Sequence, residues 1–253
     1  MNISTRTHLL SISLIVLIAG CASSSGDSRP QRSPDAGTIR SFGSDSDTVF
    51  RYLILGDSTA VGVGGSYEEG IAVTTSRHLA RERGIAMMNL AVSGAQVTDV
   101  LHEQLPRIGG FFIPDVVLLD VGANDVTHLT GAGSLEDDLR AILQSLIAMN
   151  CNVKIVLTGA ADMTTPPRIP WVLRGLAGWR TRTLNEVFER EAERFELTFA
   201  PIARETGPLF AEDPTLFSED EFHPNDRGYE TWITVIEASL DRALASQPSH
   251  CRR

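Results

Sequence analysis

The sequence predicts an α/β protein of three layers, α/β/α, in which helices cover both faces of a five-stranded parallel sheet. From about residue 48 onward, short apolar runs alternate with longer segments of helical period, as expected for strands joined by crossover helices. The apolar share of the composition, 42% of 253 residues, is large enough for a buried core. Five such strands most often lie in the flavodoxin-like order 2-1-3-4-5.

Strands and helices are expected in alternation along the chain. In the helix expected over 134 to 149, Leu135, Leu139 and Ile142 follow the three-four spacing of an amphipathic helix, with Ser134 as its N-cap. A shorter helix is expected from Ile169 to Leu176, with Pro170 in its first turn. The expected strands are about 50 to 55, 85 to 91, 115 to 121, 153 to 159 and 197 to 202, and the other helices are 71 to 83, 180 to 195 and 227 to 245.

The first 47 residues predict a targeting segment and a tether. Arg6 and the apolar stretch from Leu9 to Ala19 have the form of a signal peptide over residues 1 to 20. The residues up to Cys21 resemble a bacterial lipoprotein signal, which implies lipidation of Cys21; a plain secretory signal cut elsewhere is the alternative. Residues 21 to 47 are poor in large apolar side chains, which predicts a flexible tether. The protein is therefore expected to be exported and lipid-anchored to a membrane surface of the bacterial cell envelope.

Composition sets further limits on function. The net charge is −10 and the 22 basic residues are scattered, so no nucleic-acid partner is expected. Lys154, the single lysine, lies in an apolar run, which excludes a Ser-Lys dyad and a phosphate-loop lysine. Export would permit a disulfide between Cys151 and Cys251, but Cys251 is in a short tail, 248 to 253, after the domain expected at 48 to 247, and this position favours an unpaired thiol.

Residues that carry chemistry gather at one edge of the predicted sheet. Ser58 follows the first strand, Gly94 the second and Asn124 the third, and His223 comes after the fifth. Because the carboxyl ends of parallel strands share one edge, these residues are expected to meet there. A serine, a histidine and a carboxylate three residues before it, Asp220, supply the nucleophile, the base and the group that orients the base in serine-dependent acyl transfer.

Four blocks, in order along the chain, resemble those of the SGNH (GDSL-type) hydrolases. The resemblance covers roughly residues 50 to 240, and its first block looks like that of small bacterial esterases and lysophospholipase-like enzymes, although it reads GDST rather than GDSL. It implies that Ser58 attacks an ester carbonyl, that His223 and Asp220 complete the triad, and that the Ser58 and Gly94 amides and the Asn124 side chain form the oxyanion hole. The blocks are Gly56-Asp57-Ser58, Ser93-Gly94-Ala95, Gly122-Ala123-Asn124-Asp125 and Asp220-Glu221-Phe222-His223-Pro224.

Other residues near these blocks are expected to have supporting roles. Asp57 and Asp125 are expected to be turn formers that bond nearby amides, and His128 to have a surface or helix-start role. No HExxH motif and no zinc-spaced cysteine-histidine cluster occurs in the sequence, so neither a metal nor a cofactor is expected. The G-x-S-x-G elbow of another hydrolase class is also absent. Three acidic residues compete less well than Asp220 as the partner of His223: Glu219, Glu221 and Asp226.

The expected function is serine-dependent hydrolysis of a small-molecule or lipid carboxylic ester. Trp171, Leu173 and Leu176 are the candidate substrate-binding residues, on a short helix whose apolar face either lines an acyl pocket, touches a bilayer or packs on the core. Two alternatives stay open: an O-deacetylase of cell-envelope carbohydrates, and a non-catalytic ligand-binding lipoprotein. The sequence does not indicate the oligomeric state.

Overall fold

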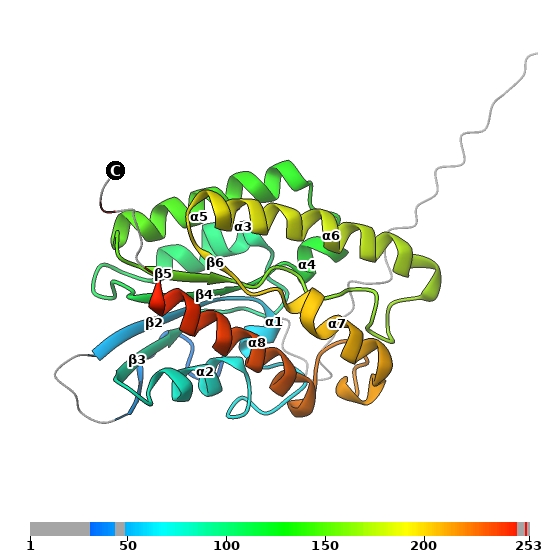
Figure 1. The fold of residues 1–253 in the computed structure, drawn as a ribbon, viewed down its shortest axis with the longest axis horizontal. Coiled ribbons are helices and arrows are strands. Elements are labelled where there is room, and N and C mark those ends of the chain that lie inside the picture. Colours follow the sequence, from blue (N-terminus) through cyan, green and yellow to red (C-terminus); the bar gives the residue numbers. More distant parts are fainter. Residues whose placement is uncertain (1–30, 44–48, 247–250, 252–253) are drawn as a thin grey trace, which may run out of the picture.

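The computed structural model describes residues 31–43, 49–246 and 251 (Figure 1). The expected signal peptide, Cys21 and part of the expected tether lie outside these residues. The strands are β1 (Arg40–Phe42), β2 (Val49–Gly56), β3 (Gly84–Asn89), β4 (Val116–Asp120), β5 (Lys154–Leu157) and β6 (Thr198–Phe199). The helices are α1 (Ser58–Val61), α2 (Ile71–Leu79), α3 (Val97–Asp99), α4 (Ala123–Thr127), α5 (Ala132–Met149), α6 (Trp171–Arg194), α7 (Ile202–Glu212) and α8 (Asp226–Ala245), with short turns of other helical types at Val100–Gln104, Leu105–Arg107 and Pro214–Leu216.

The α/β fold with helices on both sides of the sheet is confirmed, but the sheet is mixed rather than purely parallel. Its six strands lie in the order β1-β3-β2-β4-β5-β6. The strands β2 to β6 run parallel, whereas β1 pairs antiparallel with β3, Arg40 opposite Met87. The sequence did not predict β1, which lies in the expected tether. An edge strand of three residues needs only backbone pairing and one apolar contact, here Phe42 against the core, and so leaves no apolar run.

Two hydrophobic clusters, one on each face of the sheet, form the core. In β2, alternate side chains point to opposite faces, so that Leu53 and Leu55 join one cluster and Tyr52 and Ile54 the other. Helices α5 and α6 cover the first face, and α2 and α8 cover the second (Figure 1). Because β2 and β4 are covered on both sides, their residues are nearly all apolar, which is the pattern from which the sequence predicted buried strands.

Two expectations about helices are wrong. The helix α5 begins at Ala132 with Gly131 at its N-cap, so Ser134 lies within the helix and does not cap it. The two helices expected on either side of residues 177 to 179 are one helix, α6, of 24 residues, capped by Pro170. Gly178, between the two expected helices, is buried where α6 packs closely: a Cβ at this position would lie 2.6 Å from Cγ2 of Thr164. Packing therefore outweighs the low helix propensity of glycine here.

The expectation that Cys251 stays unpaired is also wrong, because Cys151 and Cys251 form a disulfide. Cys151 lies in the turn between α5 and β5, and the Lys154 side chain donates a hydrogen bond to the carbonyl of Ser246 at the end of α8. This contact brings the last turn of α8 beside the start of β5, the strand that follows Cys151. In the described part of the chain, no helix has the length and hydropathy that a bilayer crossing requires.

Candidate active site

Ser58 is presented by a sharp turn between β2 and α1. Asp57 is the N-cap of α1, and its Oδ1 accepts a hydrogen bond from the Thr59 amide at 3.0 Å, so the prediction that Asp57 forms a turn is confirmed. The Asp57 amide itself donates to the carbonyl of Asp120 at the end of β4, at 3.0 Å. The turn is thus fastened to the neighbouring strand, and Ser58 becomes the first residue of the helix.

His223 comes from a loop that folds around Asp220. Asp220 Oδ1 accepts hydrogen bonds from the amides of Phe222 and His223, each at 2.9 Å, and from the Ser218 hydroxyl at 2.8 Å. Glu221, between these residues, has a φ of 58°, in the left-handed region that allows the chain to turn back. The two residues of the Asp220-His223 pair are therefore held by one compact loop.

The side chains of Ser58, His223 and Asp220 form a continuous hydrogen-bonded chain. His223 Nε2 lies 2.9 Å from Ser58 Oγ, and His223 Nδ1 lies 2.5 Å from Asp220 Oδ2. Both Ser58 and His223 are buried. Burial raises the pKa of Asp220, but the bonds from the His223 ring and from the backbone amides of His223 and Phe222 outweigh it and hold the pKa well below its usual value. A hydroxyl, an imidazole and an ionised carboxylate are thus aligned for proton transfer.

The competing carboxylates do not contact the His223 ring. Asp226 Oδ1 instead accepts from the amide of Ser66, at 2.6 Å, and the carbonyl of Glu221 accepts from the Arg168 amide at 3.0 Å. Glu219 is exposed to solvent. Among the described residues Glu219, Asp220, Glu221 and Asp226, only Asp220 contacts the imidazole.

Gly64 allows the two halves of the site to approach each other. It follows α1 and has a φ of +92°, in the region that side chains rarely adopt. A Cβ on Gly64 would lie 2.5 Å from the Pro224 carbonyl and 2.8 Å from the His223 Cβ. The loop that carries His223 therefore packs directly against the backbone at residue 64, which helps to bring His223 to Ser58.

The three groups expected to form an oxyanion hole lie at adjoining turns. Asn124, at the start of α4, donates its side-chain amide to the Ala95 carbonyl at 3.0 Å and, more weakly, to Asp57 Oδ2 at 3.4 Å. Gly94 precedes Ala95 and has a φ of +85°, and a Cβ there would meet open space, so backbone conformation rather than crowding favours glycine. Within the described chain, neither the Ser58 nor the Gly94 amide donates a hydrogen bond.

Asp125 and His128 support this region from outside the cavity. Asp125 Oδ2 accepts from the Val97 amide at 3.1 Å, so it fastens the segment after β3 to α4, and the carboxylate also bonds the Asp125 backbone amide. Burial raises the pKa of Asp125 to about 6. His128 is exposed, closes the end of α4, and its Nδ1 lies 2.9 Å from the Asn124 carbonyl.

A second buried carboxylate, Asp120, lies beside Asp57, and the sequence analysis missed it. The Thr59 hydroxyl lies 2.9 Å from Asp57 Oδ1 and 2.8 Å from Asp120 Oδ2. A hydroxyl has one hydrogen and can donate to only one of these oxygens, so the other contact needs a proton on a carboxyl group. The signal in the sequence was a single acidic residue in the apolar run 115 to 121.

The count of donors places this proton on Asp120. Asp57 accepts from the Thr59 amide, the Thr59 hydroxyl and Asn124, whereas Asp120 has one further donor, the Thr158 hydroxyl at 2.9 Å. The carboxylate charge is therefore better stabilised at Asp57. Burial, followed by the charge of Asp120, raises the pKa of Asp57 to about 7, and burial also raises the pKa of Asp120, so the pair retains a proton far above the usual range of an aspartic acid.

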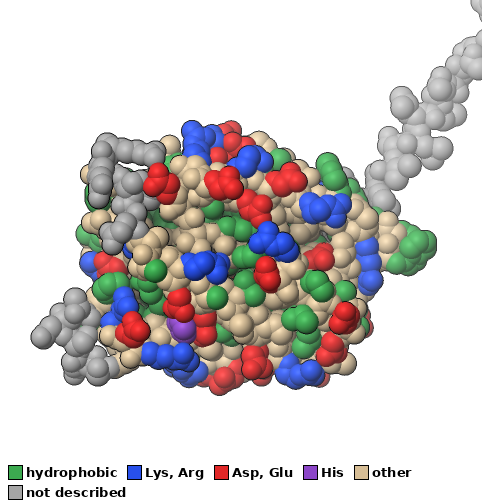
Figure 2. All heavy atoms as spheres, in the orientation of Figure 1, with side chains coloured by type: hydrophobic (Ala, Val, Ile, Leu, Met, Phe, Trp, Pro, Cys, Tyr) green, Lys and Arg blue, Asp and Glu red, His purple; other side chains and the backbone are tan. Residues whose placement is uncertain are grey.

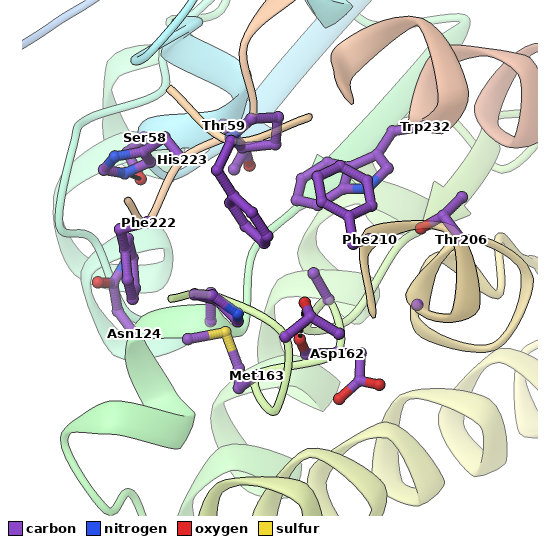
Figure 3. A pocket seen from close by; sticks show the side chains of 17 residues that line it. Ser58, Thr59, Asn124, Asp162, Met163, Thr206, Phe210, Phe222, His223 and Trp232 are labelled. Carbon is purple, nitrogen blue, oxygen red and sulfur yellow. Dashed lines mark hydrogen bonds between the residues drawn. The ribbon is translucent and has the colours of Figure 1, made fainter. Parts of the chain in front are cut away.

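A cavity opens beside Ser58 and His223 and is walled mainly by apolar side chains. In Figure 3, Ser58 and His223 lie at one end with Phe222 and Asn124 nearby, and the rings of Phe210 and Trp232 face them from α7 and α8. The centroids of these last two rings are 5.7 Å apart. The Trp232 Nε1 is buried and has no hydrogen-bond partner among the described residues. The remaining apolar wall is formed by Met163, Pro166 and Phe217.

The residues expected to bind substrate do not line this cavity. Trp171 and Leu176 are exposed on α6, and Leu173 packs against the hydrophobic core. The side chains that do line it were missed because they come from α7, α8 and the loop after β5, where their spacing is that of ordinary core residues. Among the described residues, no group of three or more His, Cys, Asp or Glu side chains could hold a metal ion.

A sheet of parallel strands with a serine, a histidine and an aspartate joined at its carboxyl edge is typical of ester hydrolases. A family model, the GDSL-like Lipase/Acylhydrolase family, matches residues 54–231. The chain belongs to this family, so the resemblance seen in the sequence is confirmed.

Relatives agree with this assignment. A GDSL-like esterase of Mycobacterium tuberculosis is 29% identical over 204 residues, which are 77% of this chain and 63% of that protein, so the chain spans less than two thirds of this relative. Among solved structures, TesA has a TM-score of 0.64 and 18% identity, covering 76% of this chain and 99% of its own. The esterase EstA from Pseudoalteromonas sp. has a TM-score of 0.60 and 20% identity, covering 78% and 99%. These two structures share the fold.

Proposed function

We propose that the protein hydrolyses carboxylic esters with Ser58 as nucleophile, His223 as general base and Asp220 as the group that orients the imidazole. The observation that carries this proposal is the hydrogen-bonded chain from Ser58 Oγ through the His223 ring to Asp220. Ser58 Oγ attacks the ester carbonyl while its proton passes to His223 Nε2. The imidazolium then protonates the leaving alcohol, and the acyl group stays on Ser58. Water, activated by the same imidazole, attacks this acyl group, which releases the acid and restores Ser58.

The negative charge that develops on the carbonyl oxygen needs donors that are already in place. We assign the Ser58 and Gly94 amides and the Asn124 side chain to this role. The two amides have no acceptor within the described chain, and the 3.4 Å contact of Asn124 with Asp57 is long enough to be exchanged for a substrate oxygen. Replacing Asn124 by alanine should lower kcat about 10²- to 10³-fold, the typical effect of removing one oxyanion donor.

The cavity suits a short acyl group. Its walls are the side chains of Phe210, Phe222 and Trp232 and their apolar neighbours, which favour a hydrocarbon chain, and these rings close the space opposite Ser58. Rates should therefore fall as the acyl chain of a chromogenic ester is lengthened. The alcohol part of the substrate is less constrained, because it leaves toward the open side of the site.

The decisive experiment replaces Ser58 by alanine. Loss of the nucleophile should reduce kcat on the order of 10⁵- to 10⁶-fold, as in other serine triads. The matched control is Ser66→Ala, because Ser66 is an exposed serine in the loop after α1 and should leave kcat unchanged. A fluorophosphonate probe should label the wild type and Ser66→Ala but not Ser58→Ala. Full activity of Ser58→Ala would exclude this mechanism.

A carbohydrate O-deacetylase is the second candidate, and one observation favours it. Asp162, which lines the cavity, also borders a polar groove that contains Thr164, Arg182 and Asn185. Hydroxyl groups of a sugar could bind such side chains while an acetyl group occupied the cavity. Hydrolysis of acetate esters alone, with a preference for acetylated sugars, would support this function; turnover of longer acyl esters would support the lipid or general esterase function.

We also propose that the protein is exported and anchored through a lipid on Cys21. The disulfide between Cys151 and Cys251 supports export, because such bonds persist in oxidising compartments. Cys21 itself lies outside the described residues. Mass spectrometry of the mature N-terminus should find an acylated Cys21, and an unmodified residue there would refute the anchor.

A further inference from the structure

The first half of α6 exposes an apolar face to solvent. Trp171, Val172, Leu176 and Trp179, called here the α6 apolar face, have exposed fractions of 82%, 62%, 48% and 54%. In the space-filling view, hydrophobic side chains stand at the right-hand edge, where α6 begins in Figure 1 (Figure 2). The second half of the same helix exposes charged side chains such as Glu186, as a solvated helix normally does. An apolar face of this kind marks a surface that contacts something else.

The segment that carries this face is basic, although the whole protein is acidic. The chain has a net charge of −10, yet no acidic residue occurs between Asp162 and Glu186. This interval carries four arginines, and Arg174 and Arg182 form no ion pair with any described residue. Exposed tryptophans with arginines beside them are the combination that binds the interface of a bilayer with anionic headgroups. The other two are Arg168 and Arg180, and the Arg180 guanidinium already donates to the carbonyls of Asp125, Val126 and Thr130.

The α6 apolar face adjoins the active site. Thr165 and Pro166, a few residues before α6, line the cavity, and the amide of Arg168 donates to the carbonyl of Glu221 in the loop that carries His223. The face and the cavity are therefore on the same edge of the sheet, and an ester that leaves a bilayer at this face would have a short path to Ser58.

The start of the described chain lies at the same edge. The Gln31 carbonyl accepts a hydrogen bond from the Ser93 amide at 2.8 Å, next to Gly94. Gln31 is ten positions after Cys21, and a chain of that length reaches at most about 35 Å when fully extended. A lipid on Cys21 would keep this edge, rather than the opposite one, within reach of the membrane.

We propose that the α6 apolar face docks onto the surface of a bilayer that contains anionic phospholipids. The Trp171 and Trp179 rings enter the interfacial region, and Arg174 and Arg182 meet lipid phosphates. Docking requires neither ester hydrolysis nor the lipid on Cys21. The lipid anchor would keep the protein near the membrane, and the docked face would fix the direction in which the cavity opens.

The protein's own tryptophans test this proposal. The chain has three, and the third, Trp232, is only 6% exposed. The full chain, carrying Cys21→Ser so that no acyl group contributes, is mixed with vesicles of phosphatidylcholine with or without phosphatidylglycerol. Lipids brominated on the acyl chain should quench the emission in the anionic vesicles, and 0.5 M salt should weaken the binding because it screens the arginines.

Variants locate the contact. The double variant Trp171→Ser, Trp179→Ser should sediment with anionic vesicles at least about tenfold less strongly, because two interfacial side chains are lost. The control Phe111→Ser changes an equally exposed aromatic residue, 72% accessible, in the loop before β4, and should bind like the parent. Thermal melting of each variant checks that the fold is retained. Absence of quenching, equal binding to neutral vesicles, or a concentration-dependent dimer that buries the face would overturn the proposal.

Discussion

Replacing Asp120 by asparagine tests the proton count at the buried carboxylate pair. With the shared proton on Asp120, this carboxyl group donates to the Thr59 hydroxyl and accepts from Thr158. Asparagine has the same shape as a protonated aspartic acid and offers the same donor and acceptor, so both bonds can be kept. We therefore expect kcat of Asp120→Asn to stay within about threefold of the wild type, a difference below about 0.7 kcal/mol.

The matched variant Asp57→Asn should behave differently. Asp57 only accepts: Oδ1 from Thr59 and Oδ2 from the side chain of Asn124. In Asp57→Asn the side-chain NH2 group must replace one of the two carboxylate oxygens. It then faces either the Thr59 donors or the Asn124 side-chain amide, so two hydrogen-bond donors oppose each other. A mismatch of this kind in a buried site costs about 1 to 3 kcal/mol, or roughly ten- to a hundredfold in kcat if Asn124 is displaced from the oxyanion.

The pair also makes stability depend on pH, with a definite sign. Burial raises the pKa of Asp57 to about 7, above the value of about 4 in an unfolded chain. Between these values the folded protein holds a proton that the unfolded chain has released, so the free energy of unfolding falls as the pH rises, by up to about 1.4 kcal/mol per unit for one proton. The stabilisation is complete below about pH 4 and is lost as the pH passes about 7.

In Asp120→Asn this dependence should be weaker. Asparagine does not titrate, so the proton that Asp120 holds in the folded protein no longer contributes, while the burial of Asp57 remains. The other ionisable groups that face the pair are unchanged, and Asp125, whose pKa burial raises to about 6, adds the same sign in both proteins. These unchanged groups are Asp125, Tyr52 and Tyr229.

Urea unfolding at pH 5, 6 and 7, with steady-state kinetics on a short chromogenic ester, measures both effects. The reasoning predicts that Asp120→Asn keeps its activity and loses part of the pH slope, and that Asp57→Asn loses activity. The reverse ranking would put the proton on Asp57. If both variants lost activity equally and the pH slope did not change, the two carboxyl groups would not share a proton.

Two further predictions follow from the backbone and the disulfide. Gly64→Ala should lower kcat at least about tenfold and also destabilise the fold, because its Cβ would meet the Pro224 carbonyl at 2.5 Å and the φ of +92° is strained. Gly110→Ala is the control, because a Cβ at residue 110 would meet open space. Equal kinetics for the two variants would show that the loop that carries His223 can move away from residue 64 without loss of activity. Replacing Cys151 and Cys251 by serine should reduce the free energy of unfolding, measured with urea, by about 2 to 4 kcal/mol and leave kcat unchanged. Unchanged stability would mean that the disulfide hardly restricts the unfolded chain.

The residues at the carboxyl edge could be located from the sequence because each is fixed by a local rule. Ser58 follows an unmistakable buried strand, and residues three apart, such as Asp220 and His223, meet in any tight turn. Their chain neighbours therefore already define most of the geometry. The distance between Ser58 and His223, 165 positions apart in the chain, follows only from the winding of the sheet, which the strand pattern also predicted.

The cavity walls and the short elements could not be predicted in this way. Phe210 and Trp232 become neighbours only because α7 and α8 pack together, and each alone is an ordinary apolar position in a helix. The strand β1 has three residues, too few for any periodic pattern, so its pairing depends on partners elsewhere in the chain. The strand β6 was expected at 197 to 202, but only two of these residues pair as a strand. The helix α6 also continues through Gly178, because packing against Thr164 compensates for the low helix propensity of glycine.

Asp120 shows where sequence patterns need a count of hydrogen bonds as well. A single aspartate at the end of the apolar strand β4 costs too much free energy to be buried as an unpaired ion, so it must be neutral, paired or exposed. Asp57 comes directly after the adjacent strand β2, and both carboxyl groups bond Thr59. This arrangement favours a pair of carboxyl groups that shares one proton. The threonine that makes this segment read GDST, Thr59, is therefore the residue that joins the turn of Ser58 to the central strand β4, and the substitution has a structural role of its own.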